Sequence, residues 1–189
     1  MEDSPHCLLH CELADEQALA IGRLMASTWP KPGKDAAIRA ASLIKLGADA
    51  HGPEALASRS FVVLDGTKVI AHAAMQPREL QTTAGPLWVM GLGAVCTDGA
   101  YRGQGLGTTI VKAAFEMIDA GVAQHSLFQT SHEVRPFYEK LGSCLVENRI
   151  VDSTADDPAA NPFWDDVVMR YPAEADWPEG EIDLRGPGY

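Results

Sequence analysis

The chain has 189 residues, of which 46% are hydrophobic and 22% charged, and its formal net charge at pH 7 is −11. This length suits one compact domain with a core of ordinary size. The excess of acidic residues argues against nucleic-acid binding, which needs clustered Lys and Arg, and no apolar run reaches the roughly 20 residues of a membrane span. A negative field attracts cations such as amines, and it also keeps a protein in solution.

The start of the chain and its cysteines bear on the compartment. Residues Met1 to Cys7 lack the basic and long apolar regions of a secretory signal, so we expect a cytoplasmic protein with reduced thiols. His6-Cys7 and His10-Cys11 resemble half of a zinc site, but no second pair at a suitable spacing follows, and no metal is expected. The sequence does not define the oligomeric state; a homodimer, the commonest symmetric assembly of soluble proteins, is one candidate.

Hydrophobic periodicity predicts the helices and strands in chain order. They are a helix capped by Asp15 and ended by Trp29 to Gly33, a helix over 35–50 closed by Gly52-Pro53, strands over 61–64 and 68–75, a strand over 87–96, a helix over 108–120, a strand over 126–130, a short helix over 134–141, and strands over 144–151 and 167–171.

Glycines refine this pattern at three places. Asp65-Gly66 predicts a tight hairpin turn, because it supplies the positive φ angles that such turns need. Gly91 and Gly93 inside the strand 87–96 indicate a bulge or a close approach of another segment. Gly121 is expected to stop the helix before it.

The order of the elements predicts an α+β fold with a mixed sheet flanked by helices, since a hairpin is combined with strand-helix units. Residues 1–171 are expected to form a single domain. Residues 172–189 turn to Pro, Gly, Glu and Asp, which predicts an acidic tail with little core of its own, packed on the same domain.

The segment before the helix 108–120 has the composition of an anion site. Gly103, Gly105 and Gly107 alternate there, so the backbone N–H groups can turn inward without Cβ obstruction. Thr108 then opens a helix whose N-terminal N–H groups favour phosphate, and Arg102 adds a charge with two parallel donors. The spacing fits neither the dinucleotide fingerprint nor the P-loop, and it predicts a pyrophosphate site of another kind.

This loop resembles the pyrophosphate loop of the GNAT superfamily of N-acetyltransferases, which reads Arg or Gln, two residues, Gly, one residue, Gly or Ala. Arg102, Gly105 and Gly107 match that pattern in order. The resemblance covers most of the chain and implies a splayed central sheet, acetyl-CoA as the acyl donor and direct transfer to a primary amine.

The resemblance also implies which residues contact the donor. The pantetheine arm would pair like an extra strand with the backbone at Val95, Cys96 and Thr97. Ser131 stands where many members have an Asn that contacts the cofactor. The pyrophosphate would lie on the backbone amides of the loop, contributed by Arg102, Gly103, Gln104, Gly105, Leu106, Gly107 and Thr108.

The same comparison implies a general acid but leaves the base open. Tyr138 matches the tyrosine that commonly protonates the leaving thiolate, and its neighbour Phe137 is expected to be the core residue. The aminoglycoside N-acetyltransferase branch, which the chain resembles most, has a Glu nine residues before the loop arginine; that position is Gly93 here. His72, Glu79, or a water chain ending on backbone carbonyls are the alternatives. The strand position of Cys96 disfavours an acyl-cysteine route.

The expected function is therefore an acetyl-CoA-dependent N-acetyltransferase whose acceptor is a cationic small molecule. The alternatives are a non-catalytic acyl-CoA-binding module and an acetyltransferase of protein N-termini or lysines. Acidic residues between 152 and 166, with Phe163 and Trp164 among them, are candidates for the acceptor lining through charge and cation–π contact, as is the tail. Acidic turns of no further function explain the same residues equally well.

Overall fold

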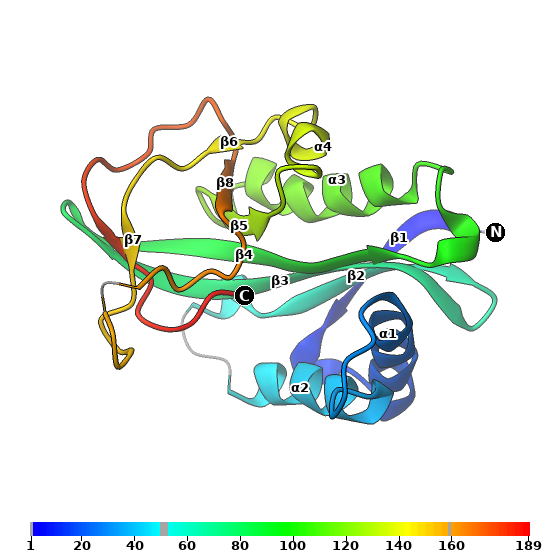
Figure 1. Ribbon diagram of the computed structural model, residues 1–189. Helices are drawn as coiled ribbons and strands as arrows, with labels where there is room; N and C mark the ends of the chain where they lie inside the picture. Colours follow the sequence, from blue (N-terminus) through cyan, green and yellow to red (C-terminus); the bar gives the residue numbers. More distant parts are fainter. Residues whose placement is uncertain (1, 50–52, 159) are drawn as a thin grey trace. The chain divides into compact units, whose positions relative to one another are not determined.

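The computed structural model describes residues 2–49, 53–158 and 160–189. They form two compact units that alternate along the chain: unit 1 comprises Met1–Gln76 and Ala94–Glu116, and unit 2 comprises Pro77–Gly93 and Met117–Tyr189. Strands β3 (Lys68–Thr82) and β4 (Gly85–Thr97) and helix α3 (Leu106–Asp119) contribute to both units (Figure 1). The predicted fold class, α+β with a mixed sheet and flanking helices, is confirmed. The single domain over 1–171 with a tail stays a prediction.

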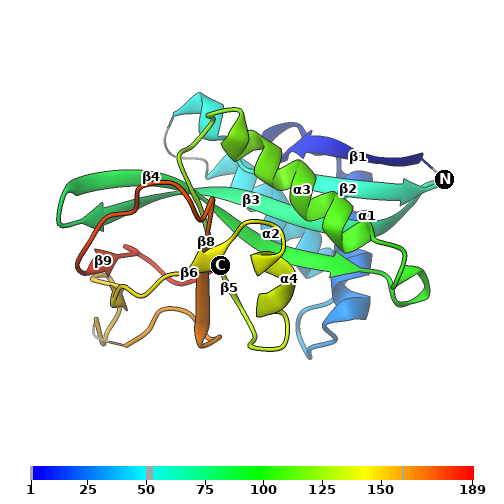
Figure 2. The same cartoon turned by 90° about the horizontal axis from the view of Figure 1, so that it is seen from above.

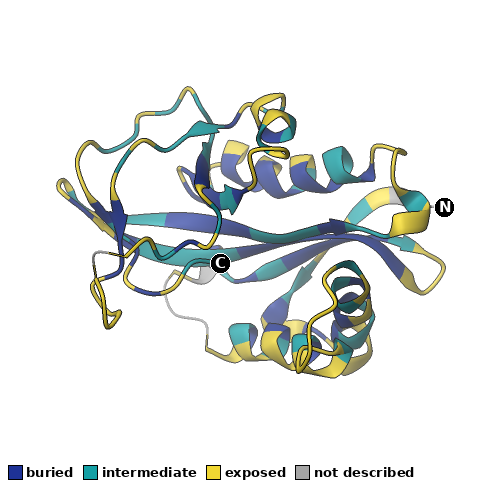
Figure 3. Cartoon of the chain, viewed as in Figure 1, coloured by how far each residue is buried: buried dark blue, intermediate teal, exposed yellow. Residues whose placement is uncertain are grey.

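Unit 1 is a sheet with helices on both faces. Strands β1 (Glu2–Leu9) and β2 (Arg59–Asp65) pair antiparallel, and β2 pairs antiparallel with the first part of β3. Helices α1 (Asp15–Thr28) and α2 (Ala36–Ala48) pack on one face of these strands, and α3 lies on the other (Figures 1 and 2). The exposed sides of α1 and α2 face away from the strands (Figure 3). The core beneath them contains Ile21, Leu24, Leu43, Val62 and Cys96.

Local hydrogen bonds determine where the helices α1 and α2 of unit 1 begin. Asp35, predicted as the first residue of a helix, is instead the cap of α2, and its carboxylate accepts the Ile38 N–H at 2.9 Å. The end predicted at Ala50 to Gly52 lies outside the described residues. Asp15 is the first residue of α1 rather than its cap, so that prediction is wrong. The backbone N–H of the preceding residue, Ala14, is instead bonded by the Gln17 side chain at 3.1 Å.

The remaining features of unit 1 are a hairpin turn, a strand that was not predicted and short connecting turns. The hairpin is confirmed, with Asp65 opposite Lys68 and Gly66 at φ +59. Strand β1 was not predicted, because its short, mixed sequence carries no clear alternation. Short 3₁₀ turns join the elements: η1 (His10–Glu12), η2 (Glu54–Leu56) and η3 (Gly99–Tyr101).

Unit 2 continues β3 and β4 and adds the C-terminal strands. Strand β5 (Ser126–Thr130) runs parallel to β4, β8 (Val167–Tyr171) pairs antiparallel with β5, and β6 (Cys144–Leu145) pairs with β8. Strand β7 (Ile150–Val151) pairs with β9 (Ile182–Asp183), which also pairs with β3. Helix α4 spans Arg135–Glu139.

Two predictions need correction, namely the strand expected over 144–151 and the start of helix α3. The strand expected over 144–151 is interrupted, because the Asn148 carboxamide turns toward the tail and bonds the carbonyls of Pro178 and Gly180. The tail supplies core residues to unit 2: Ile182 and Leu184 are fully buried. Helix α3 opens at Leu106, two residues earlier than predicted. Within the described residues, no helix combines the length and the apolar character of a membrane-spanning segment.

Candidate functional site

The glycine loop of unit 1 turns its backbone toward solvent. Gly103 and Gly105 have φ angles of +80 and +83, a region that residues with a Cβ rarely adopt. A Cβ at either position would meet no atom within 4 Å, so the backbone angle rather than crowding requires glycine. Residues 102–105 are exposed and Leu106 is buried. Alternating left-handed residues bring successive N–H groups toward a common point, which is the geometry of an anion nest.

The first turn of α3 extends this row of donors. The Thr109 N–H donates to the Gly105 carbonyl at 3.0 Å, as the first turn of a helix requires. The N–H groups of Leu106, Gly107 and Thr108 precede that bond and have no carbonyl one turn earlier in the helix. Together with the positive end of the helix dipole they favour a negative ligand by roughly 0.3–1 kcal/mol for the dipole contribution.

Side chains from the hairpin hold the loop in place, and no motif in the sequence indicates them. The Tyr101 hydroxyl donates to Asp65 at 2.6 Å. Asp98 accepts from the Ala100 N–H at 2.9 Å and pairs with the Lys68 ammonium at 2.8 Å. The bond to Lys68 lowers the pKa of the Asp98 carboxyl, and the same bond raises the pKa of Lys68. The only signal in the sequence was the proximity of Asp65 and Lys68 at the hairpin turn.

The strand end that precedes the loop carries an unusual backbone angle. Ala94 has φ +51, which is uncommon for a residue with a Cβ. Cys96 points into the core of unit 1, and burial raises the pKa of its thiol to about 12. A protonated, buried thiol is a poor nucleophile. Val95 and Thr97, on either side of it, are only partly buried.

The structure places His72 in the interior of unit 1. Its ring is fully buried, with Nε2 2.9 Å from the Ser60 hydroxyl and Nδ1 2.9 Å from the Ala94 carbonyl oxygen. The same hydroxyl lies 2.8 Å from Nε2 of His10, which is also buried. Burial lowers the pKa of both histidines to about 4. Both nitrogens of His72 are therefore occupied by the protein itself.

Tyr138 and Ser131 belong to unit 2. The Tyr138 ring packs on Phe128 with centroids 4.6 Å apart, and burial raises the pKa of its hydroxyl. The expectation that Phe137 is the core residue is wrong: Tyr138 is buried and Phe137 only partly so, because Tyr138 faces the β5 aromatic. Ser131 is exposed and its hydroxyl accepts the Val134 N–H at 3.3 Å, just before α4.

Glu79, the other candidate base, also lies in unit 2. Its carboxylate accepts a hydrogen bond from Arg185 of the tail at 2.8 Å, and its side chain is 35% exposed. The glycine loop, the end of β4 and His72 thus belong to unit 1, whereas Glu79, Ser131 and Tyr138 belong to unit 2.

The two glycines in the interior of β4, Gly91 and Gly93, both lie beside the tail but differ in how closely it approaches them. A Cβ at Gly91 would lie 2.6 Å from the ring of Tyr189, which confirms the close approach that glycine predicted. A Cβ at Gly93 would lie 3.6 Å from the Tyr189 carbonyl carbon, an ordinary contact. The hydroxyl of Tyr189 is buried, with no hydrogen-bond partner among the described residues.

The acidic segment before β8 is held by local contacts. Asp152 is buried and accepts from the N–H and hydroxyl of Thr154, so it stabilises its own turn. Phe163 packs edge-on against Tyr189, while Trp164 is 73% exposed. Gln129 of β5 fixes this segment by accepting the N–H of Trp164 at 3.0 Å. Of the two aromatic candidates for the acceptor lining, only Trp164 presents its ring to solvent.

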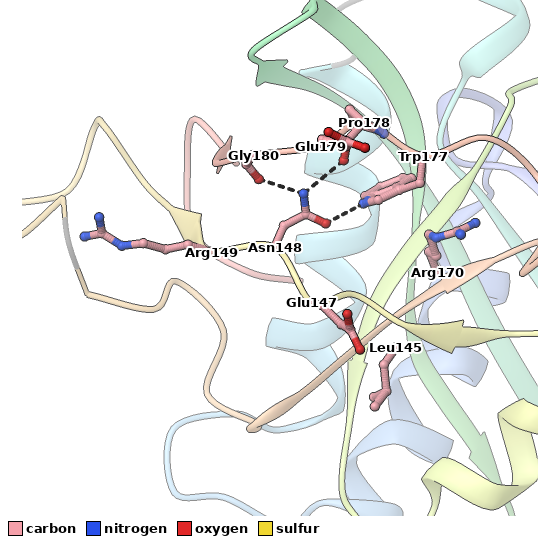
Figure 4. A pocket seen from close by; sticks show the side chains of 9 residues that line it. All are labelled: Leu145, Glu147, Asn148, Arg149, Arg170, Trp177, Pro178, Glu179 and Gly180. Carbon is pink, nitrogen blue, oxygen red and sulfur yellow. Dashed lines mark hydrogen bonds between the residues drawn. The ribbon is translucent and has the colours of Figure 1, made fainter.

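A depression of about 530 Å³ lies in unit 2 beside the tail (Figure 4). The Asn148 carboxamide donates to Pro178 and Gly180 and accepts from the Trp177 indole at 2.8 Å. The depression is lined by Leu145, Glu147, Asn148, Arg149, Arg170, Trp177, Pro178, Glu179 and Gly180.

Arg170, in the same lining, is also engaged by the tail. It donates to the carbonyls of Pro172, Ala173 and Ala175 and stacks on Trp177 at 5.4 Å. Asn148 and Arg170 thus hold the tail in place, and their polar groups are already used by the protein itself.

Comparison with known proteins gives one family match. Residues 57–142 match the acetyltransferase (GNAT) domain, a segment that contains β2 to α4 and the glycine loop. No curated protein matches the chain significantly in sequence.

Solved structures share the fold at low sequence identity. The chain is similar to the GNAT family N-acetyltransferase YhbS from Escherichia coli in complex with CoA, with a TM-score of 0.64, 17% identity, and 96% and 89% of the two chains covered. An acyl-CoA N-acyltransferase from Pseudomonas aeruginosa gives a TM-score of 0.58 at 15% identity, covering 88% and 97%. Glucosamine-6-phosphate N-acetyltransferase from Arabidopsis thaliana gives 0.57 at 14% identity, covering 82% and 99%.

Proposed function

Because residues 57–142 match the acetyltransferase (GNAT) domain, we propose that this chain is a GNAT-type enzyme that transfers the acetyl group of acetyl-CoA directly to the primary amine of a small cationic molecule. The observation that carries the donor assignment is the glycine loop, where two left-handed glycines and the start of α3 direct a row of amides toward solvent. A pyrophosphate suits such a row because each oxygen can accept from backbone N–H groups.

Most of the residues proposed to contact acetyl-CoA belong to unit 1. The amides from Arg102 to Thr108 hold the pyrophosphate, and the Arg102 side chain, which is exposed beside them, adds charge. The backbone at Val95, Cys96 and Thr97 pairs with the pantetheine arm. Ser131 contributes a further hydrogen bond. When bound, acetyl-CoA supplies an activated thioester, so the protein has only to position it and to manage protons.

Tyr138 is proposed as the general acid for the departing thiolate. Burial raises the pKa of its hydroxyl, so the hydroxyl carries its proton at neutral pH and is a weaker acid than a free tyrosine; the support for this role is its match to the family's tyrosine. The amine needs a base, because an amine with a lysine-like pKa is neutral in roughly one molecule in 2,500 at pH 7, which costs about 4.6 kcal/mol.

Three bases remain proposals. The lone pair of His72 is engaged by Ser60, and its low pKa makes it a weak base. Glu79 is accessible but paired with Arg185. A water chain that ends on backbone carbonyls needs neither side chain, and the absence of a side chain at Gly93 favours this route.

The acceptor class rests on charge. The net charge of −11 and the exposed Trp164 ring near acidic residues support a cationic amine. An aminoglycoside is one member of that class, and the resemblance to the aminoglycoside N-acetyltransferase branch supports it. Cytoplasmic location and a homodimer stay predictions.

Two measurements test the proposal. Isothermal titration with acetyl-CoA is expected to give a dissociation constant below millimolar; a weaker value would overturn the donor assignment. Release of CoA is then followed with an aminoglycoside, a polyamine, an amino sugar and a lysine-containing peptide.

Tyr138→Phe should lower turnover by about 100-fold or more without changing acetyl-CoA affinity. Tyr171→Phe, which removes a hydroxyl bonded to Asp119, serves as the matched control and should retain turnover. Binding without turnover for any amine would favour the non-catalytic acyl-CoA-binding module, and turnover with the peptide alone would favour a protein acceptor.

A further inference from the structure

A buried hydrogen-bond chain in unit 1 has a direction that its chemistry determines. The Ala94 carbonyl can only accept, so Nδ1 of His72 carries the proton and donates across 2.9 Å. Nε2 of His72 must then accept, so the single hydroxyl proton of Ser60 points to it. The Ser60 oxygen in turn accepts from Nε2 of His10 at 2.8 Å. The chain runs from His10 through Ser60 and His72 to Ala94.

This series of hydrogen bonds holds both histidines neutral and in one tautomer each. All three side chains are buried, and burial lowers the pKa of the histidines to about 4. At neutral pH His72 therefore presents a fixed donor to the Ala94 carbonyl rather than a titrating base.

The bond acts on a peptide plane next to the donor site. In a trans peptide the C=O of one residue and the N–H of the next point in opposite directions. His72 lies on the face of the sheet covered by α1 and α2, opposite Val62 in the register. By drawing the Ala94 carbonyl to that face, it turns the Val95 N–H to the opposite face.

Ala94 needs this support because of its backbone angle. A residue with a Cβ at φ +51 is strained by about 1–3 kcal/mol and persists only where its surroundings determine it. A peptide whose carbonyl lacked the His72 bond would be free to relax, and the Val95 N–H would turn with it.

Building on the proposed function, we infer that His72 is a positioning residue for acyl transfer: held by Ser60 and His10, it fixes the 94–95 peptide so that the Val95 N–H is aimed at the thioester carbonyl of acetyl-CoA. Its role is to set the polarisation of that carbonyl; this assignment takes the place of the base role for His72 and leaves Glu79 or a water chain to remove the proton from the amine.

The test uses acetyl-CoA labelled with ¹³C at the acetyl carbonyl, because the resonance of that carbon reports hydrogen bonding to its oxygen. On the wild-type protein the bound resonance is expected to move downfield from that of free acetyl-CoA. His72→Leu should abolish this shift, whereas His72→Asn, whose amide can place a donor near Nδ1, should retain it. With a reactive amine, kcat of His72→Leu should fall about tenfold or more while KM for acetyl-CoA stays within about threefold.

His125→Leu is the matched control, since it removes a buried histidine of unit 2 that packs on Trp177; the downfield shift should persist in it. If His72→Leu does not fold, Ser60→Ala decides, because it frees the His72 ring and should reduce the shift.

The outcomes separate the two proposals. Failure of the wild-type protein to bind acetyl-CoA would overturn the proposed function and this inference with it. Binding without a downfield shift, or a shift that survives in His72→Leu, would overturn the inference alone. Equal loss in His72→Leu and His72→Asn would also overturn it, because the effect would then not depend on the donated hydrogen bond.

Discussion

Replacing Gly105 by Ala tests the glycine loop with the least disturbance elsewhere. Gly105 has φ +83, and a methyl group there would meet no atom within 4 Å. The penalty is therefore conformational, not steric. A residue with a Cβ in the left-handed region is destabilised by about 1–2 kcal/mol, which corresponds to roughly a 5- to 30-fold change in an equilibrium constant.

That penalty must appear in one of two measurements. If the loop of Gly105→Ala relaxes in the free protein, binding has to restore the strained angle, and the dissociation constant of acetyl-CoA rises by that factor. If the loop keeps its angle, the free energy of unfolding falls instead. Isothermal titration and thermal unfolding of the same variant distinguish these cases.

Gly99→Ala is the matched control. Gly99 lies in the same segment, a Cβ there would also meet no atom within 4 Å, and its φ is not in the left-handed region. Both quantities should stay unchanged in this control. If Gly105→Ala changed neither affinity nor stability, or if Gly99→Ala changed them equally, the backbone argument for the loop would be refuted.

Three further predictions follow from packing and protonation. Gly91→Ala should lower the free energy of unfolding by about 1–3 kcal/mol because its methyl group collides with a tail tyrosine ring, whereas Gly93→Ala should be tolerated; equal melting temperatures would contradict this. Cys96, with a pKa of about 12, should resist alkylation at pH 8 while the exposed Cys7 reacts, as mass spectrometry of the native protein would show. His72 is held neutral with a folded pKa of about 4, against 6.5 when unfolded. Its contribution, of order 3 kcal/mol, is present above pH 6.5 and lost as the pH falls toward 4. Denaturant titrations between pH 7 and pH 4 should show that the free energy of unfolding falls less steeply with pH in His72→Asn than in the wild-type protein. An equal fall in both proteins would contradict the assignment of the low pKa to His72.

Local patterns predicted much of the fold. The turn at Gly66 and the strands β5 and β8 follow from residues adjacent in sequence, because turn angles and strand alternation are local properties. Strand β1 and the interruption after β6 could not be predicted in this way. The first depends on pairing with β2, and the second on bonds from Asn148 to the tail, thirty or more residues away.

The candidate site, like the fold, could be predicted from the sequence only in part. The glycines and Arg102 were visible because an anion nest needs a particular backbone and a helix start, both of which leave a sequence pattern. The brace formed by Asp98 and Lys68 was not visible, since side-chain pairing across the sheet has no fixed spacing. His72 was predicted as a candidate base because the pKa of a free imidazole lies near neutral pH. Its burial between Ser60 and Ala94 lowers that pKa.

The sequence by itself determined the kind of donor site in this protein: three alternating glycines before an amphipathic helix specify backbone angles, and backbone angles are set by residues next to one another. Only the tertiary structure decided what surrounds that site. The burial of His72, the angle of Ala94 and the approach of the tail to Gly91 arise from contacts between distant segments. Burial and long-range contacts set hydrogen bonding and protonation, so the chemical roles of these residues depend on the folded chain.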